Sequence, residues 1–423
     1  MKNIINKIKN HKLCSYLIFN ILFLLVTGFL FTFRLSTYKL NATLYIPLLI
    51  INIIIIILYL LFKKKNKEKI RFKSFDFFLI IFIIFTLISS ILSINTSDAF
   101  FGRVGRYEGF FQIMYYISLF FISSFLDKEE KKVVSYAIIT LGLCEVIQAH
   151  IQKFDLFGVP VIHNDGKPWA TGYTCNPNFF GSLSVLVLSI VIGLLFDSKT
   201  KKVKIIYFIL ISIFTSGLLI SDTLSALVGL IVLLIYVFTY ALNKKKKLLF
   251  LILMLIISLL TLIESLTKKT DLINDLIKTK DQSIEIAKGN VQDNFGTNRM
   301  FIWKETIKVV PDNLTYGVGV DNFYYAFGDR PLSRKHRYFD KAHNEYLQIL
   351  VCEGIYALVS YLIFIFIILI KGIKYSFKKE TLFFVAPVIA YLVQAFFNIS
   401  VIEVAPIFYI CLGLLSNRDK TNN

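Results

Sequence analysis

Residues 298–303 read Asn-Arg-Met-Phe-Ile-Trp, residues 317–323 read Gly-Val-Gly-Val-Asp-Asn-Phe, and residues 341–347 read Lys-Ala-His-Asn-Glu-Tyr-Leu. All three motifs lie between about Asp293 and Gly354, at the polar end of the longest hydrophilic interval in an otherwise apolar chain. Long apolar runs precede and follow this interval. We therefore interpret the apolar runs as a scaffold and the polar interval as the part of the chain that carries chemistry.

The composition indicates a membrane protein. The chain has 423 residues, of which 56% are hydrophobic, and its mean hydropathy is +0.66. Soluble domains are roughly 45–50% apolar. The net charge of +19 could suggest a nucleic-acid partner, but the lysines fall in short clusters between apolar runs, as expected for cytoplasmic loops. The five cysteines have no metal-binding or redox spacing, so neither a metal site nor a disulfide framework is expected.

Apolar runs near 20 residues long are sufficient to cross a bilayer as helices. The sequence predicts an all-α, polytopic fold with about 12 transmembrane helices and one large extracytoplasmic loop that itself contains helices. The predicted spans lie near 13–33, 44–62, 75–94, 109–126, 133–152, 179–196, 205–220, 224–242, 248–264, 346–370, 381–398 and 401–416.

The distribution of lysine predicts the orientation in the cell membrane. Basic clusters such as 63–65 and 244–247 fall on one side when the spans alternate, so that side and both termini are predicted to be cytoplasmic. Polar intervals at 95–108, 153–178 and 265–345 are then extracytoplasmic. The chain divides into spans 1–9 (1–264), an extracytoplasmic catalytic loop (265–345) and spans 10–12 (346–423).

The long loop is expected to contain helices. Residues 271–288 have apolar positions at helical spacing, suited to lying on the membrane or on the bundle. Asn298 is positioned to cap a second helix that Pro311 would end. In that helix Arg299 and Trp303 share a face.

His343 and Arg299 are the candidate catalytic residues. An imidazole titrates near neutral pH and can take a proton from a hydroxyl, and a guanidinium binds phosphate oxygens as a planar fork. The structural alternatives are an interfacial histidine that caps a helix and an arginine that snorkels beside Trp303. His163 and His336 are also predicted to be extracytoplasmic, and position alone does not rank the three histidines.

Several further residues are candidates for substrate binding. Arg103 and Arg106 could hold a diphosphate, or they could simply pair with Glu108 and Asp98. The other candidates are Asn176 and Asn178, which could instead cap a span; Gly317 and Gly319, which suit a tight turn; and Trp303 and Asn344. Polar residues in or between apolar runs, namely Glu145, Gln148, His150 and Glu403, suit either packing or a lining role.

Taken together, these motifs resemble the O-antigen ligase and polymerase superfamily of bacterial membrane glycosyltransferases. The resemblance rests on Arg299 with Trp303, on 317–323, on 343–347 with Gly354, and on the Arg-Tyr-Glu-Gly and Asn-Pro-Asn-Phe motifs at 106–109 and 176–179. It covers most of the chain. The order, spacing and predicted side of the motifs make the set specific.

The resemblance implies transfer of a glycan from a polyprenyl-diphosphate carrier, such as undecaprenyl diphosphate, to an acceptor hydroxyl outside the membrane. The acceptor would be a glycan, lipid or protein, and the product a cell-surface or cell-wall polysaccharide. No nucleotide, cofactor or obligatory metal is implied, and Arg299 and His343 correspond to the family's essential arginine and histidine. A departure occurs at Leu224, where the family often has arginine, so Arg103 or Arg106 would have to supply part of the phosphate binding.

From these residues we expect His343 to take the acceptor proton while cationic groups stabilise the leaving diphosphate, in a single displacement that inverts the anomeric centre.

The alternative from another functional class is a flippase or transporter for a lipid-linked sugar. A transporter should concentrate polar groups at mid-membrane and often has repeated halves, whereas this chain places its polar groups in asymmetric outer loops.

Overall fold

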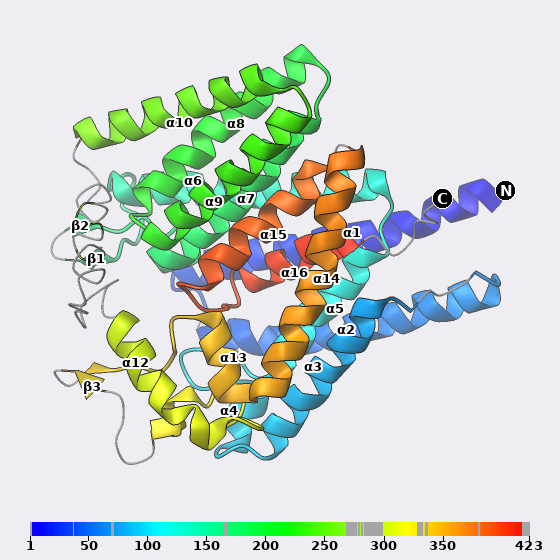
Figure 1. Ribbon diagram of the computed structural model, residues 1–423, viewed down its shortest axis with the longest axis vertical. Coiled ribbons are helices and arrows are strands. Elements are labelled where there is room, and N and C mark those ends of the chain that lie inside the picture. The colour runs from blue at the N-terminus through cyan, green and yellow to red at the C-terminus, as the bar shows by residue number, and fades with distance from the viewer. Residues whose placement is uncertain are drawn as a thin grey trace.

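The computed structural model describes residues 2–416 except 37, 69–71, 165–166, 268–276, 278–279, 281, 283–298, 328–332, 335–336 and 380. Within these residues the fold is a bundle of α-helices with two very short antiparallel ribbons (Figure 1). The ribbons pair β1 (His163–Asn164) with β2 (Lys167–Pro168), and β3 (Ser333–Arg334) with β4 (Arg337–Tyr338). The predicted all-α fold is therefore confirmed.

The helices of the first part of the chain are α1 (Lys2–Thr32), α2 (Tyr38–Lys65), α3 (Ser74–Ile91), α4 (Thr96–Phe101), α5 (Phe110–Ser124), α6 (Lys128–Lys153), α7 (Pro177–Asp197), α8 (Lys201–Ile220), α9 (Leu224–Asn243) and α10 (Lys247–Thr267). The remaining helices are α12 (Arg299–Val309), the short 3-10 turns η1 (Pro311–Asn313) and η2 (Phe323–Phe327), α13 (Glu345–Glu353), α14 (Ile355–Lys379), α15 (Leu382–Ala395) and α16 (Ala405–Ser416).

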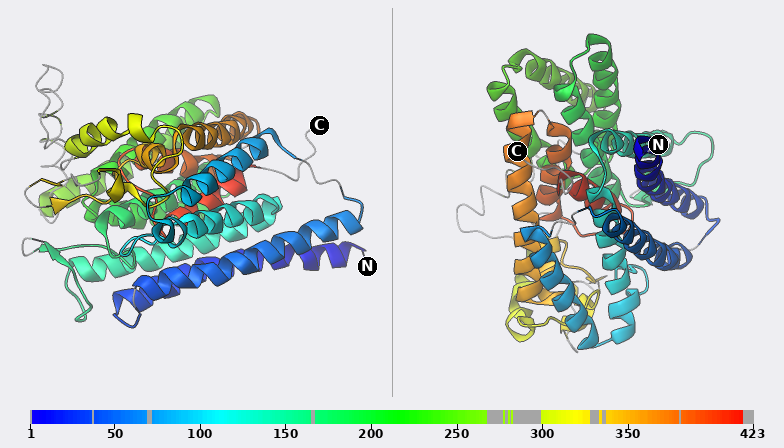
Figure 2. Two further views of the ribbon diagram at one scale, coloured as in Figure 1. Left: turned by 90° about the horizontal axis from the view of Figure 1, so that it is seen from below. Right: turned by 90° about the vertical axis from the view of Figure 1, so that its right-hand side faces the viewer.

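Nine of the described helices are long and apolar enough to cross a membrane. Three shorter apolar helices, α5, α15 and α16, occupy the remaining predicted spans. The chain is thus a multi-pass membrane protein. Basic residues end α2 at 63–65, and other lysines begin α8 and α10. In Figure 2 the long helices run in roughly one direction, and α12 lies at the end of the bundle away from the start of α1.

Helix α7 forms the centre of the bundle. Every side chain from Phe180 to Phe196 is buried, because α6, α8, α9 and α15 pack around it. At Gly193 the helices come so close that an added Cβ would lie 2.2 Å from the Cα of Phe383. Small residues permit such close approach between membrane helices. The α7–α15 contact consequently depends on the glycine.

The predicted tenth span is divided into two helices. Gly354 has a φ of +86°, which favours glycine, and it separates α13 from α14. The single helix predicted for 346–370 was therefore wrong: the long apolar helix begins at Ile355. The helix predicted for 271–288 lies almost entirely outside the described residues.

The last two predicted spans are shortened because residues 396–404 form a turn inside the bundle. Ile399, Val401, Ile402 and Val404 are all buried there, although none belongs to a helix. Non-helical backbone at membrane depth is tolerated where protein surrounds it or where it lines a cavity. This turn lines two cavities that are described below.

We expect Gly193→Ala to destabilise the protein by about 1–3 kcal/mol, because overpacking forces α7 and α15 apart. Thermal unfolding of the purified chain in detergent measures the change. Thr140→Ala on the exposed face of α6 is the matched control and should unfold close to the native midpoint. Equal midpoints for the two variants would contradict the proposed close contact.

Candidate functional site

The glycine motif at 317–319 joins the long loop to the end of α13. The backbone N–H of Val318 donates to the carbonyl of Val351 (3.0 Å), and that of Gly319 donates to Cys352 (2.9 Å). These bonds satisfy carbonyls that a helix end leaves unpaired. An added Cβ at Gly317 would lie 2.2 Å from the carbonyl carbon of Cys352, so only glycine fits. The predicted tight turn is present, and its recorded contacts are structural.

Asp321 connects three segments immediately after this turn. One carboxylate oxygen accepts hydrogen bonds from the backbone N–H groups of Arg103 (2.7 Å) and Glu108 (3.2 Å). The other lies 2.5 Å from Nζ of Lys341. The side chains of Asp321 and Lys341 are only 1% and 5% exposed. A single carboxylate thus fixes both ends of the 103–108 loop and the segment that leads to His343.

Glu108 extends this buried group. Its carboxylate accepts a hydrogen bond from the Tyr116 hydroxyl at 2.6 Å. Burial raises the pKa of Glu108 to about 8, although Lys341 and the Tyr116 bond oppose the rise. Glu108, Asp321 and Lys341 line a cavity with about 550 Å³ of empty volume, part of it open to solvent, and Ile399 and Ser400 form part of its wall. We call it the first cavity.

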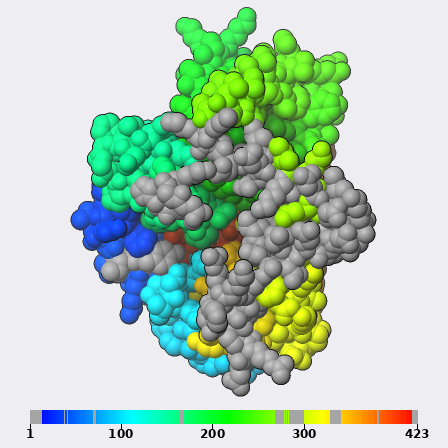
Figure 3. Space-filling model, turned by 90° about the vertical axis from the view of Figure 1, so that its left-hand side faces the viewer, coloured from blue at the N-terminus to red at the C-terminus, as the bar shows by residue number. Residues whose placement is uncertain are grey.

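Trp303 places α12 over this region. Its indole N–H donates to the carbonyl of Ala342 at 3.1 Å, and its ring meets Phe396 edge-on with centroids 5.4 Å apart. Arg299 lies one helical turn before Trp303 on the same face of α12. Trp303 therefore brings Arg299 toward His343, the residue after Ala342. In Figure 3 the surfaces of residues near 100 and near 300–327 lie close together at this end of the molecule.

Cationic side chains from three segments lower the pKa of His343. Burial is the largest cause that lowers the pKa of His343, and the charges of Arg299, Arg106 and Lys341 add to it, whereas Asp340 raises the pKa; the net pKa is about 4. The imidazole is consequently neutral at physiological pH and can accept a proton. His343 also has a φ of +49°, a conformation that is uncommon for a residue other than glycine.

Arg299 is a half-buried cation. Burial lowers the pKa of Arg299 to about 10, and no carboxylate from the described residues offsets that effect. The guanidinium still remains charged at neutral pH. An arginine that is withdrawn from water in this way favours an anionic partner, and a carboxylate or phosphate matches its fork of donors.

The two arginines of the first polar loop differ in their surroundings. Arg106 makes a bidentate ion pair with Asp340, at 2.7 and 3.0 Å, and this pair lowers the pKa of Asp340 to about 2 despite burial. The guanidinium of Arg103 lies 3.9 Å from the centre of the Tyr324 ring. Pairing with Glu108 and Asp98 was the alternative left open by the sequence; the ion pair found for Arg106 is with Asp340, and the side-chain bonds described for Glu108 and Asp98 come from Tyr116 and Tyr325.

The predicted asparagines act as helix caps. Asn344 accepts hydrogen bonds from the N–H groups of Tyr346 and Leu347 at the start of α13, which orients the residue beside His343. Asn176 caps α7 by accepting from Asn178, whose own carbonyl accepts from Ser182. Among the described contacts, neither Asn176 nor Asn178 meets Arg299 or His343.

Of the other histidines considered from the sequence, His150 is the one whose side chain the structure describes. Both ring nitrogens of His150 have partners at 2.8 Å, the Val146 carbonyl and the Ser216 hydroxyl. His336 lies outside the described residues, and the side chain of His163 is likewise not described.

Leu224, where the family often has an arginine, is the first residue of α9. In the turn just before it, Lys153 forms an ion pair with Asp222 at 3.2 Å.

The sequence analysis did not select Asp321, Asp340 or Lys341 as site residues. Asp321 and Lys341 lie within two of the motifs quoted above, and Asp340 immediately precedes one of them. Their importance comes from pairings across more than 200 residues, between the first polar loop and the long loop. A single sequence contains no signal for such pairings.

Comparison with known protein families supports the motif analysis. Residues 208–362 match the family model described as O-Antigen ligase. The match runs from α8 into α14, so it includes Arg299, the glycine turn and His343. It confirms the resemblance to the O-antigen ligase and polymerase superfamily over this interval, which is less than half of the chain. No curated protein matches the sequence.

Asp321→Ala should destabilise this end of the molecule by about 3–5 kcal/mol, because it leaves Lys341 buried without its partner. The double variant Asp321→Ala with Lys341→Met removes that charge and should recover part of the loss. Thermal unfolding and limited proteolysis of the detergent-purified chain measure both effects. Asp312→Ala, at an exposed position in η1, is the control, and an Asp321→Ala variant as stable as this control would contradict the role of the ion pair.

Proposed function

We propose that this chain is a glycosyltransferase of the O-antigen ligase type that acts on the outer face of the cytoplasmic membrane. It transfers a glycan from a polyprenyl-diphosphate carrier to an acceptor hydroxyl. The observation that carries the proposal is a neutral histidine within electrostatic range of three cationic side chains. A base surrounded by positive charge suits a reaction in which a hydroxyl attacks and a diphosphate leaves.

The diphosphate binds at Arg299. This guanidinium is half-buried, and its planar fork matches two phosphate oxygens. Arg106 lies within electrostatic range of the same histidine, but it already binds Asp340. The incoming diphosphate therefore competes with Asp340 for Arg106, whereas Arg299 has no such carboxylate among the described residues.

His343 acts as the general base. It accepts the proton of the acceptor hydroxyl as the acceptor oxygen bonds to the anomeric carbon. The bond from that carbon to the carrier oxygen breaks, and the diphosphate leaves with the electron pair. One displacement inverts the anomeric centre. In this proposal the guanidinium groups neutralise the developing charge on the leaving group, a role that a metal ion fills in other transferases.

The proposed orientation rests on the distribution of charge. Lysines end α2 and begin α8 and α10, at helix ends that the predicted topology assigns to the cytoplasm. Arg299 and His343 belong to the segment between α10 and α14, which this topology places outside. A lipid-linked donor that has already crossed the membrane then meets the site from the bilayer.

Removing Arg299 or His343 should abolish most of the transfer, for different reasons. Arg299→Ala should weaken binding of undecaprenyl diphosphate about 10- to 100-fold, because charge-assisted hydrogen bonds contribute about 1.5–3 kcal/mol. Arg299→Lys should retain part of this binding because it keeps the charge without the fork. His343→Ala should bind the carrier normally but lower transfer about 100-fold or more.

These effects are measured as carrier binding in nanodiscs and glycan transfer in membranes with matched protein levels. Lys308→Ala, which removes an exposed cation from the same helix as Arg299, is the control. Near-native transfer by His343→Ala would remove the histidine from the proposed role. Full activity of Arg299→Ala would disprove carrier binding at that residue.

In the pH profile of the native chain, kcat/KM should fall on acidification near pH 4 and not near pH 6.5. The pKa of His343 is lowered to about 4, so the imidazole stays neutral and competent as a base until the pH falls through that value. Arg299→Gln removes a charge that lowers this pKa, and its residual activity should therefore decline at a higher pH. Transfer rates measured between pH 3.5 and 8 in reconstituted vesicles test both statements, and a limb near 6.5 in the native chain would contradict them.

A further inference from the structure

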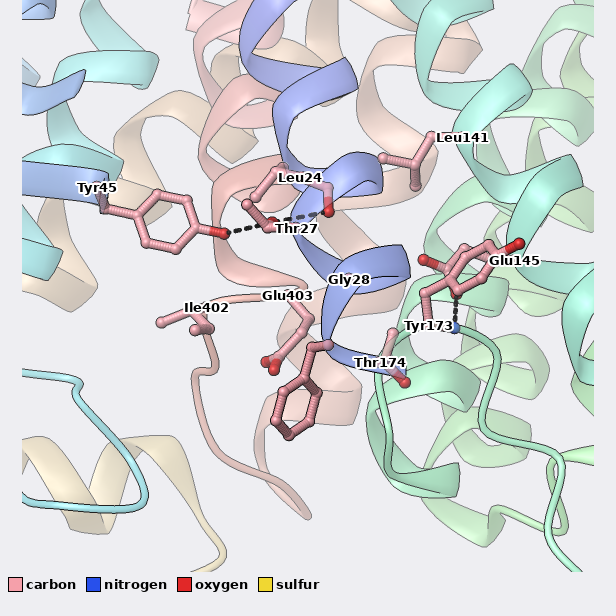
Figure 4. Close-up of a pocket in the computed structure, with 11 residues that line it drawn as sticks. Leu24, Thr27, Gly28, Tyr45, Leu141, Glu145, Tyr173, Thr174, Ile402 and Glu403 are labelled. Atoms are coloured by element: carbon pink, nitrogen blue, oxygen red, sulfur yellow. Dashed lines mark hydrogen bonds between the residues drawn. The ribbon is translucent and has the colours of Figure 1, made fainter. Parts of the chain in front are cut away.

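A second cavity shares the 396–404 turn with the first, and its described lining contains no basic residue. It has about 440 Å³ of empty volume, part of it open to solvent. Its wall combines α1, α2 and α6 with the 173–174 loop and the turn between α15 and α16 (Figure 4). The lining residues are Leu24, Thr27, Gly28, Phe31, Tyr45, Leu141, Glu145, Tyr173, Thr174, Ile402 and Glu403.

The lining is apolar, hydroxyl-bearing and acidic. Figure 4 shows the carboxyl groups of Glu145 and Glu403 on either side of the α1 turn at Gly28. The glycine has no side chain of its own, and Tyr173 packs against it. The Tyr45 hydroxyl lies 3.4 Å from the Thr27 hydroxyl. Among the described residues that line this cavity none is basic. A phosphate would meet two carboxyl groups and no cation there, so the second cavity does not suit the diphosphate.

Hydrogen bonds hold the 171–173 loop, which forms part of the cavity wall, in place before any ligand binds. The backbone N–H of Tyr173 donates to Glu145 at 2.7 Å. Gln152 holds the same loop, since it accepts from the N–H of Thr171 and donates to the Gly172 carbonyl. Gly172 has a φ of +56°, and a Cβ there would lie 2.3 Å from the Glu145 carboxyl group. A wall that is already ordered lowers the entropy cost of binding.

The two cavities share one wall. Ile399 and Ser400 line the first cavity, and Ile402 and Glu403, two and three residues further on, line the second. The first cavity is also lined by Lys341 and Glu345, the residues on either side of the 342–344 segment that carries His343. The same turn therefore contributes to the wall of the second cavity and to that of the cavity beside the 341–345 segment, which carries His343.

We propose that the second cavity binds the sugar end of the acceptor, a hydroxyl-rich and non-anionic glycan, and directs its hydroxyl toward His343. This inference rests on the proposed function and assigns its acceptor subsite. Carboxyl oxygens accept hydrogen bonds from sugar hydroxyls, and the hydroxyls of Tyr45, Thr27 and Thr174 can both donate and accept. Polar groups placed to pair with a substrate hydroxyl also discriminate against ligands that lack it.

The test places a photo-crosslinking residue in the cavity of the full-length chain in cells. Benzoylphenylalanine replaces Phe31, which lines the cavity, or Phe238, which is exposed on α9 and serves as the matched control. The cells are fed azide-tagged neutral sugars, so a captured glycan is detected by its tag. We expect tagged glycan at position 31 and at least tenfold less at position 238.

Substitutions then separate the acceptor from the donor. The double variant Glu145→Gln and Glu403→Gln should lower the captured glycan about tenfold, because each substitution replaces an acceptor oxygen by an amide nitrogen that cannot accept, and a hydrogen bond contributes about 0.5–1.5 kcal/mol. Its binding of undecaprenyl diphosphate in nanodiscs should be unchanged, which also shows that it folds. Glu129→Gln, at an exposed glutamate of α6, should alter neither quantity. In Arg299→Ala the tagged glycan should persist although carrier binding is weakened about 10- to 100-fold.

Each contrary result has a distinct meaning. Absence of tagged glycan at position 31 in a chain that binds the carrier and transfers glycan would overturn the acceptor subsite and leave the proposed function intact. Loss of the tag together with the carrier in Arg299→Ala would mean that the cavity holds donor glycan, which also overturns the inference. Failure of the native chain to bind undecaprenyl diphosphate would refute the proposed function itself.

Discussion

The buried ion pair between Asp321 and Lys341 is the constraint on which the rest of this site depends. Two charges withdrawn from water are tolerated only when they pair closely and find further hydrogen bonds. Asp321 satisfies this requirement by also accepting the backbone N–H groups of Arg103 and Glu108. Because Lys341 is two residues from His343, the pair fixes the distance between the first polar loop and the histidine. Removal of either partner would leave the other as an uncompensated buried charge. The free-energy cost of such a charge keeps the 103–108 loop and the segment before His343 together.

The site combines rigid contacts with cations at its edge. Trp303 anchors α12 to the backbone beside His343, and the glycine turn completes the end of α13. These contacts place Arg299, Arg106 and Lys341 around one imidazole and keep it neutral. Carboxyl groups line both cavities, but the lining of the first also includes Lys341, whereas none of the described residues that line the second is basic. The 396–404 turn contributes to the walls of both.

The sequence was sufficient to predict the helical bundle, the polar interval and the pair of Arg299 and His343, because hydropathy and motif spacing are local properties. It was insufficient where tertiary structure decides. The break at Gly354 interrupts a mostly apolar run, and the 396–404 turn is itself largely apolar. For Arg106 the sequence left open a diphosphate or a pairing with Glu108 or Asp98, whereas the structure pairs it with Asp340, more than 200 residues away. Asn176 and Asn344 have the residue type expected for binding, yet their side chains cap helices.

The enclosure of α7 has a consequence for the biogenesis of the protein. Its face toward α15 is covered by residues that follow it by nearly 200 positions in the chain. During synthesis α7 enters the membrane long before α15 exists, so the hydroxyls of Ser182, Ser184 and Ser189 initially face lipid or another partner. Native packing is completed only when the last helices arrive. The bundle therefore closes late: α7 lacks one of its main neighbours until α15 is made, and α5 until α16 is made.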